Sequence, residues 1–237
     1  MKQNSFISVI LTVACSLMFV ACSDWTEPTP VDYNPIFPDE QAPSLHEKYE
    51  QSLKEYKNRK HTLMLICFAN NPGTTLGEQD FLRSLPDSVD FVVLTNADNL
   101  SVYDKEDISK LKRTGTKFLY YKNLSEFYDQ CEETENLEEF KTKMNAALKN
   151  GESDEFDGYY VQFGRAGSMM HVDFFNEVTT AIREKLAAIG GPKANNGKLV
   201  FFDGIVTFTV DYSGRYEEPF IDLVDYFVDG QIVLLER

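Results

Sequence analysis

Short apolar segments alternate with amphipathic helical segments along most of the chain, and this alternation constrains the fold more than any other feature. The clearest apolar runs are 89–94 and 199–202, which are typical of strands covered on both faces, as in parallel sheets. We expect strands at 62–68, 89–95, 116–121, 158–163, 198–202 and 226–235, and helices at 44–59, 104–114, 137–150, 171–189 and 218–224. The pattern predicts an α/β fold of about six βα units.

The number of units leaves two architectures open. A closed eight-stranded (β/α) barrel typically needs ~250 residues, and regular structure in this 237-residue chain is expected only from Ser44 onward. The prediction is therefore an incomplete or truncated TIM-type (β/α) barrel, or alternatively an open doubly wound sheet with a terminal hairpin. Asp203-Gly204 and Asp229-Gly230 are each flanked by apolar residues, which is a hairpin signal. Such a hairpin would cover an exposed sheet edge.

The first 43 residues are expected to direct and tether the chain. Lys2 precedes an apolar segment from Phe6 to Ala21, which is typical of a secretory signal and too short for a comfortable membrane span. Cys22 follows Ala21 directly and resembles the bacterial lipobox, where this Cys becomes the lipid-bearing N-terminus. Residues 1–21 are thus predicted to be a signal peptide. Residues 22–43, which contain five prolines, are predicted to be a lipidated tether, and residues 44–237 are predicted to form the domain that follows it. The alternative is a soluble secreted protein cut near Ala21.

Charge and cysteine content exclude several classes of function. The chain has 23 Lys and Arg against 38 Asp and Glu, a formal net charge of −15, which argues against nucleic-acid binding. Anionic lipid headgroups should repel it, so membrane attachment is expected through the lipid on Cys22.

Four Cys are too few for a disulfide scaffold. Cys67 is expected to be a buried thiol, and Cys67 and Cys131 either pair or stay free. No metal or cofactor is expected, because the three His, expected at the surface or at helix ends, lack metal-ligand spacing.

One segment carries a family resemblance. Phe156-Asp157-Gly158-Tyr159-Tyr160-Val161-Gln162-Phe163-Gly164 resembles the fourth strand of glycoside hydrolase family 18, whose pattern is Asp-Gly-x-Asp-x-Asp-x-Glu. Segments that precede the other strands follow the same family order, at 56–61, 85–90, 115–117, 191–193 and 225–228. Together they resemble the Bacteroides lipoprotein branch related to endo-β-N-acetylglucosaminidases, as does Ser23-Asp24 after Cys22. The resemblance implies a glycan or glycoprotein partner containing N-acetylglucosamine. It also implies an outer-membrane lipid anchor in the cell envelope, exposure at the cell surface, and glycan-uptake partners in that membrane.

The chain departs from the family where the chemistry should be. The resemblance places Asp, Asp and Glu at Tyr160, Gln162 and Gly164, where the Glu protonates the leaving oxygen and the preceding Asp orients the substrate N-acetyl group. None of these three positions has a carboxyl group here. In the sixth strand Gln231 is shifted by one residue from the family's Gln, and strands seven and eight are expected to be missing. No catalytic residue is therefore assigned.

Three functions follow from these observations. The first is a non-catalytic, surface-anchored glycan-binding protein. Its candidate ligand-binding residues are polar or aromatic side chains near predicted strand ends: Asn70, Asn71, Asn96, Tyr121, Tyr160, Gln162, Asp203 and Gln231. An alternative for Tyr160 and Gln162 is that they fill the lumen. The second function is an endo-β-N-acetylglucosaminidase-like hydrolase whose acid is displaced to Asp203, Glu217 or Glu218. The third is a degenerate, truncated member of the family.

Overall fold

The computed structural model describes residues 43–70, 77–165, 170–205, 214–228 and 234–235. The predicted signal peptide, Cys22 and most of the tether lie outside the described residues, as do Asn71 and Gln231. The chain divides into two units, Met1–His46 and Glu47–Arg237, and the second contains every strand. Within the described residues no helix has both the length and the apolar character needed to cross a membrane.

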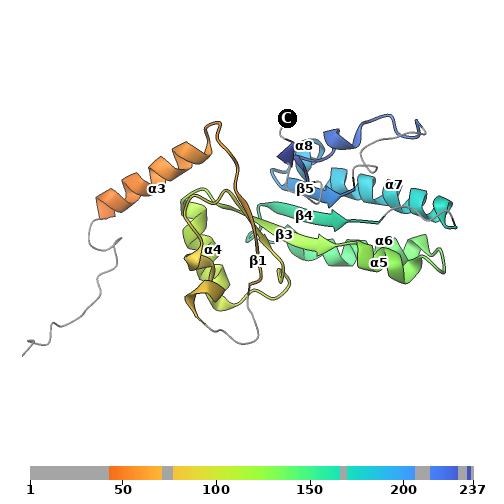
Figure 1. Cartoon of the computed structure of the whole chain (residues 1–237), viewed down its shortest axis with the longest axis horizontal. Helices are drawn as coiled ribbons and strands as arrows, with labels where there is room; N and C mark the ends of the chain where they lie inside the picture. The colour runs from red at the N-terminus through yellow and green to blue at the C-terminus, as the bar shows by residue number, and fades with distance from the viewer. Residues whose placement is uncertain (1–42, 71–76, 166–169, 206–213, 229–233, 236–237) are drawn as a thin grey trace, which may run out of the picture. The chain divides into compact units, whose positions relative to one another are not determined.

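One seven-stranded sheet forms the core of the second unit (Figure 1). Its strands lie in sequence order from β1 to β7. Strands β1 to β6 pair in parallel, and β7 pairs antiparallel with β6. The strands are β1 (Leu65–Phe68), β2 (Phe91–Leu94), β3 (Lys117–Asn123), β4 (Gly158–Phe163), β5 (Leu199–Gly204), β6 (Tyr226–Val228) and β7 (Leu234–Leu235).

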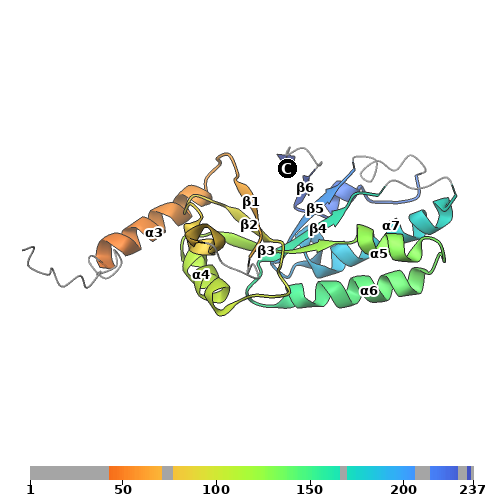
Figure 2. The ribbon, with the colours of Figure 1, turned by 60° about the horizontal axis from the view of Figure 1, so that its bottom comes forward.

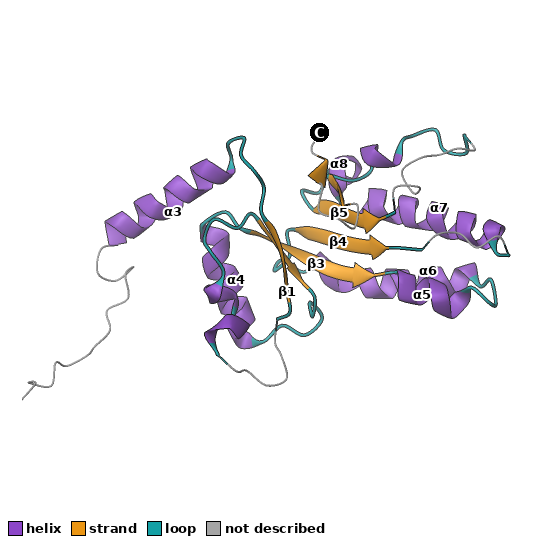
Figure 3. Ribbon diagram, viewed as in Figure 1, coloured by secondary structure: helices purple, strands orange, loops and turns teal. Residues whose placement is uncertain are grey.

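The helices follow the predicted positions with a few differences (Figure 3). They are α3 (Pro43–Lys57), α4 (Val102–Arg113), α5 (Ser125–Cys131), α6 (Leu137–Lys149), α7 (Val172–Ile189) and α8 (Gly191–Ala194). Helix α4 begins earlier than predicted because Ser101 and Asp104 form a reciprocal cap: the Ser101 hydroxyl accepts from the Asp104 amide at 3.0 Å, and Asp104 accepts from the Ser101 amide at 2.8 Å. The sequence did not predict α5, and the predicted helix at 218–224 is only a 3₁₀ turn, Phe220–Asp222.

Strand order decides between the two predicted architectures. A doubly wound sheet reverses its order at a switch point, where helices move to the other face. Here the six parallel strands keep one direction of progression, and residues of α4, α5, α6 and α7 share one apolar cluster with one face of the sheet. Figure 2 shows these four helices on the same side of the strands. The incomplete TIM-type barrel is therefore confirmed, and the doubly wound alternative is wrong.

The sheet curls about its other face. Phe91 on β2 and Tyr226 on β6 have ring centroids 5.5 Å apart, although four inter-strand steps of ~4.8 Å would separate them by about 19 Å in a flat sheet. A second cluster fills this inner face: Phe91, Val93, Leu119, Tyr160, Phe201 and Val228. The inner face is thus the lumen side of a half-barrel, packed with aromatic side chains.

The hairpin signal at Asp203-Gly204 is wrong. Both residues belong to β5, where Asp203 pairs with Gln162 and Gly204 pairs with Phe163. The next described strand, β6, runs parallel to β5, so these two strands do not form a hairpin. The antiparallel β6–β7 pair agrees with a terminal hairpin, and its connecting residues 229–233, with Asp229-Gly230, lie outside the described residues.

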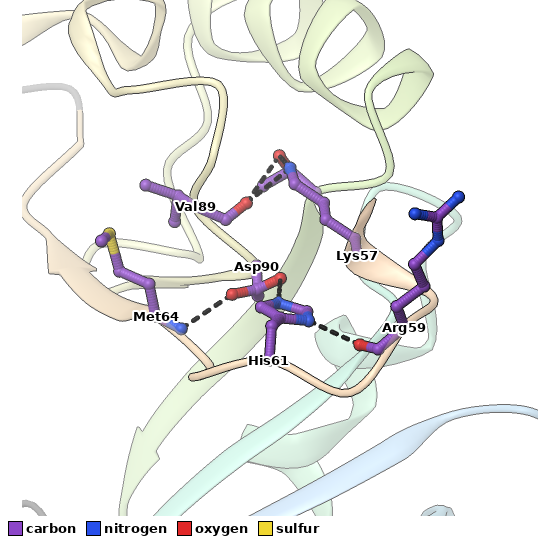
Figure 4. A network of polar contacts seen from close by, with 7 residues as sticks. Lys57, Arg59, His61, Met64, Val89 and Asp90 are labelled. Atoms are coloured by element: carbon purple, nitrogen blue, oxygen red, sulfur yellow. Dashed lines mark hydrogen bonds and ion pairs between the residues drawn. The ribbon is translucent and has the colours of Figure 1, made fainter. Parts of the chain in front are cut away.

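His61 lies in a buried polar network, not at the surface (Figure 4). Its Nδ1 contacts the Arg59 carbonyl oxygen at 2.7 Å and its Nε2 contacts Asp90 Oδ1 at 2.9 Å. The Met64 amide donates to Asp90 Oδ2 at 2.7 Å, and the Lys57 ammonium donates to the Val89 carbonyl at 2.7 Å. The side chains of His61 and Asp90 are 8% and 5% exposed. The network joins the segment after α3 to the start of β2, a long-range contact that the spacing of His residues does not reveal.

Candidate functional site

Four polar side chains lie together on the inner face, near the carboxyl ends of three adjacent strands. They are Tyr121 on β3, Tyr160 and Gln162 on β4, and Asp203 on β5. Tyr121 pairs with Tyr160 in register, and Gln162 pairs with Asp203. Because side chains alternate between faces, Tyr159, Val161 and Phe163 point instead into the helix-covered core. We call these four residues the inner polar cluster.

Hydrogen bonds join the inner polar cluster into one chain. The Tyr121 hydroxyl donates to Gln162 Oε1 at 2.7 Å. Gln162 Nε2 donates to Asp203 Oδ2 at 2.9 Å, and the Tyr160 hydroxyl donates to the same oxygen at 3.1 Å. Asp203 Oδ1 accepts no hydrogen bond from the described residues. The cluster therefore holds one carboxylate in a fixed orientation with one oxygen available.

The two tyrosines of the cluster keep their hydroxyl protons. Burial, followed by the charge of Asp203, raises the pKa of Tyr160 and of Tyr121 above the ordinary tyrosine value. The charge of Glu126, an exposed residue of α5, also raises the pKa of Tyr121. Both hydroxyls are thus donors at neutral pH. Tyr160 is 6% exposed and belongs to the apolar cluster of the inner face, so its ring packs among the other side chains of the lumen.

Cys67 is exposed, and the prediction of a buried thiol is wrong. Partial burial, followed by the charge of Asp203, raises the pKa of the Cys67 thiol. Cys67 pairs in register with Val93, which belongs to the apolar cluster of the inner face, so the thiol lies on the same face as the inner polar cluster. Its charge raises the pKa of Tyr121 and Tyr160. The apolar run suggested cover on both faces, but β1 is an end strand of the half-barrel. Cys131 is buried, and neither Cys forms a disulfide.

Asn70 and Asn96 lie in a separate network. Asn70 is 1% exposed; its Nδ2 donates to the Asn96 carbonyl at 3.1 Å, and its Oδ1 accepts from the Asn96 amide at 3.1 Å. Its Nδ2 also approaches Asp104 Oδ2 of α4 at 3.5 Å. These bonds join the ends of β1 and β2 to α4. Asn70 is therefore a structural residue here, and its side chain does not belong to the inner polar cluster.

The two glycines of the fourth-strand motif, Gly158 and Gly164, differ in the space around them. A Cβ on Gly158 would lie 2.2 Å from the Leu199 carbonyl oxygen, whereas a Cβ on Gly164 would meet nothing within 4 Å. The Gly164 amide donates to the Ser125 hydroxyl at 3.1 Å, and the residue is exposed. Gly158 is needed for the close approach of β4 and β5. Gly164, where the family resemblance places the acid, has space for a side chain.

The other displaced-acid candidates lie elsewhere. Glu217 and Glu218 line a cavity of about 310 Å³ together with Arg183 and Tyr216, and Glu218 also forms an ion pair with Lys193 at 2.8 Å. This cavity adjoins α7, outside the half-barrel. Of the three, only Asp203 contacts the motif positions. In the parts of the chain that the structure describes, no group of three or more His, Cys, Asp or Glu is arranged to hold a metal ion.

A parallel half-barrel with polar side chains at the carboxyl ends of its strands defines the class of (β/α)-barrel domains, whose sites lie at this end. Residues 26–183 match the family described as glycoside hydrolase family 18, BT1044-like, and the chain belongs to that family. Tyr160, Gln162 and Gly164 lie inside the matched range, and Asp203 lies beyond it. No curated protein sequence matches the chain.

Solved structures agree with this fold. Apo endo-beta-N-acetylglucosaminidase from Cordyceps militaris is 16% identical, with a TM-score of 0.51, over 75% of this chain and 60% of that chain. A doubly substituted form of that enzyme in complex with fucosyl-N-acetylglucosamine-Asn gives a TM-score of 0.50 at the same identity and coverage. A selenomethionine variant of BT1044 is 18% identical, with a TM-score of 0.50, over 80% of this chain and 63% of that chain. The chain thus spans about 60% of the length of these relatives, and at this identity the likeness shows the fold alone.

Proposed function

We propose that this chain is a surface-anchored, non-catalytic lipoprotein that binds glycans containing N-acetylglucosamine. The observation that supports the proposal is the inner polar cluster, which stands at the site end of a family 18 half-barrel. Planar amide, carboxylate and tyrosine groups that converge there suit the hydroxyl and acetamido groups of a sugar. The Cordyceps militaris neighbour was solved with fucosyl-N-acetylglucosamine-Asn, which supports this class of glycan.

The residues at the motif positions argue against catalysis. General acid catalysis is typically worth ~10²–10⁴ in rate, and the resemblance assigns that task to the position of Gly164, which has no side chain. Gln162 is an amide and its Oε1 and Nε2 are both engaged. The proposed chain therefore retains a place for a sugar without the acid that would cleave it.

The lipid anchor is the part of the proposal that rests on sequence. Cys22 directly follows an apolar leader and precedes a proline-rich segment. Acylation of Cys22 would hold the half-barrel at the outer membrane, facing outward, beside proteins that take up glycans. Incorporation of labelled fatty acid that is lost in Cys22→Ser tests this step, and equal labelling of the variant would contradict it.

Hydrolysis with a displaced acid is the second candidate. The hydrogen bond between Gln162 and Asp203 favours it, because a carboxylate lies next to the motif positions, one strand away. As a hydrolase, the protein would release sugar from N-acetylglucosamine-containing glycans, and Asp203→Asn would abolish that release.

Calorimetry and mass spectrometry distinguish the functions. The whole chain, purified in a detergent without a sugar headgroup, is titrated with N,N′-diacetylchitobiose and with fucosyl-N-acetylglucosamine-Asn, while released sugar is followed by mass. Saturable binding without release is the expected result, and Gln162→Ala should weaken it. Glu138→Gln is the control, since the Glu138 side chain is 83% exposed on α6. A folded chain that binds neither glycan would instead support a degenerate family member.

A further inference from the structure

We infer that the inner polar cluster is selective for uncharged glycans that donate hydrogen bonds, that it excludes acidic glycans, and that Asp203 is the residue that decides this. The inference rests on the proposed function and specifies its ligand. It follows from the hydrogen-bonding capacity left in the cluster and from the charges that surround it.

The capacity left in the cluster is mainly for accepting hydrogen bonds. Both tyrosine hydroxyl protons are used inside the cluster, on Gln162 and Asp203. Asp203 Oδ1 remains as a carboxylate acceptor, and the hydroxyl oxygen of Tyr121 can accept as well. One N–H of Gln162 is the remaining donor. A sugar hydroxyl or acetamido N–H can donate to Asp203, whereas a sulfate or carboxylate has only acceptors to offer.

In the described parts of the chain, no Lys or Arg is hydrogen-bonded or ion-paired to the inner polar cluster. Among the described residues, Lys117 lies on β3 four residues before Tyr121, roughly 13 Å along the strand, with its ammonium over the ring of Phe91. Arg165 follows β4 and is paired with Asp129. Glu126 adds negative charge near Tyr121. The internal segments 71–76, 166–169, 206–213 and 229–233 contain no Lys or Arg, whereas the terminal residues 236–237 include Arg237.

The cost of placing an anion beside Asp203 decides the selectivity. Two like charges a few ångströms apart, without a cation between them, repel strongly in a partly buried site. A neutral donor at the same point instead gains a hydrogen bond to a charged group, which is stronger than one between neutral groups. The expected discrimination is at least about tenfold in affinity.

Cys67 provides a reporter that needs no mutation. Its thiol is exposed, and Cys67 pairs in register with Val93 of the inner apolar cluster, which places it on the face that carries Asp203, Tyr121 and Tyr160. A sugar bound at the cluster should cover it and slow its alkylation. Cys131 is buried in the same chain and serves as the internal control. Peptide mass spectrometry separates the two sites, and a lipidated Cys22 does not contribute to the Cys67 peptide.

The experiment compares two probes on the whole chain: N,N′-diacetylchitobiose and its 6-sulfated counterpart. Each is added at increasing concentration, alkylation of Cys67 by iodoacetamide is timed, and binding is measured in parallel by calorimetry. The neutral probe should protect Cys67 at a concentration at least about tenfold lower than the sulfated probe. In Asp203→Asn the neutral probe should bind about tenfold more weakly, and the difference between the two probes should shrink. Glu138→Gln removes one exposed negative charge from α6 and should change neither result.

The outcomes separate the inference from the proposed function. Equal protection of Cys67 by both probes overturns the selection by charge and leaves glycan binding intact. The same conclusion follows if a folded Asp203→Asn chain still rejects the sulfated probe. Calorimetric binding without protection of Cys67 places the glycan elsewhere and also overturns the inference. If calorimetry detects neither probe, the proposed function itself fails. The comparison of the two probes on the unmodified chain tests the selection against acidic glycans even if the variant does not fold.

Discussion

Gly158 begins β4 and Gly164 follows its end, and replacing each by Ala should have very different effects on stability. A Cβ on Gly158 would meet three backbone atoms of Leu199, at 2.2, 2.7 and 2.8 Å. Real Cβ atoms essentially never come closer than 3.0 Å, so the shortest contact must open by at least about 0.8 Å. Backbone cannot rotate away as a side chain can. Strands β4 and β5 would have to separate where six residue pairs hold them in register.

The expected loss follows from this geometry. Overpacking typically costs ~1–3 kcal/mol, and the upper part of that range applies because the clash is with backbone. Part of this loss is offset, because Ala has less conformational entropy than Gly in the unfolded chain, which stabilises the folded state by ~0.4–1 kcal/mol. Gly158→Ala should therefore lose about 1–2.5 kcal/mol of unfolding free energy, or roughly 2–10 °C in Tm for a domain of this size. Gly164→Ala, with open space around its Cβ, should stay within about 0.5 kcal/mol of the parent.

Urea unfolding followed by far-ultraviolet circular dichroism measures both variants. Tryptophan fluorescence is a poor probe, because the single Trp is Trp25, outside the described residues. Equal midpoints for Gly158→Ala and Gly164→Ala would refute the argument that β4 and β5 require a glycine at their closest approach.

Three further predictions concern buried polar groups and chemistry. Asp90→Asn should lose about 2–4 kcal/mol of stability in urea unfolding, because Asp90 holds both the His61 ring and the Met64 amide in a buried site; a loss below 0.5 kcal/mol would contradict this. Burial, followed by the charge of Glu152, raises the pKa of Tyr159 to about 12. The folded state therefore keeps this proton after the unfolded chain has lost it, and stability should fall as pH rises from ~10 to about 12. Tyr159→Phe should flatten that fall in a series of urea titrations, and an unchanged slope would count against the burial argument. Gln162→Glu or Gly164→Glu alone should release no oligosaccharide by mass spectrometry, because the orienting Asp is also absent; release by either variant would overturn the non-catalytic proposal.

The site was only partly predictable from sequence. Alternation along β4 placed Tyr160 and Gln162 on one face, and the structure agrees. The role of Asp203 was obscured by a Gly neighbour that resembled a turn, although β5 continues through both residues. Asn70 looked like a ligand-binding side chain at a strand end, but its amide holds β1, β2 and α4 together. Hydrogen-bond partners of this kind are far apart in sequence, so no local pattern reveals them.

The α/β class, most of the strands and the face on which each side chain of β4 lies could be predicted before folding was considered, because these depend on local periodicity. It also showed that the three motif positions lack carboxyl groups. The single direction of strand progression and the curl of the sheet are visible only in the folded chain, since strand order depends on packing between distant segments. The curl brings Phe91 to Tyr226. The end position of β1 leaves Cys67 exposed, and the register of β4 and β5 sets the Asp203 carboxylate against Gln162 and Tyr160.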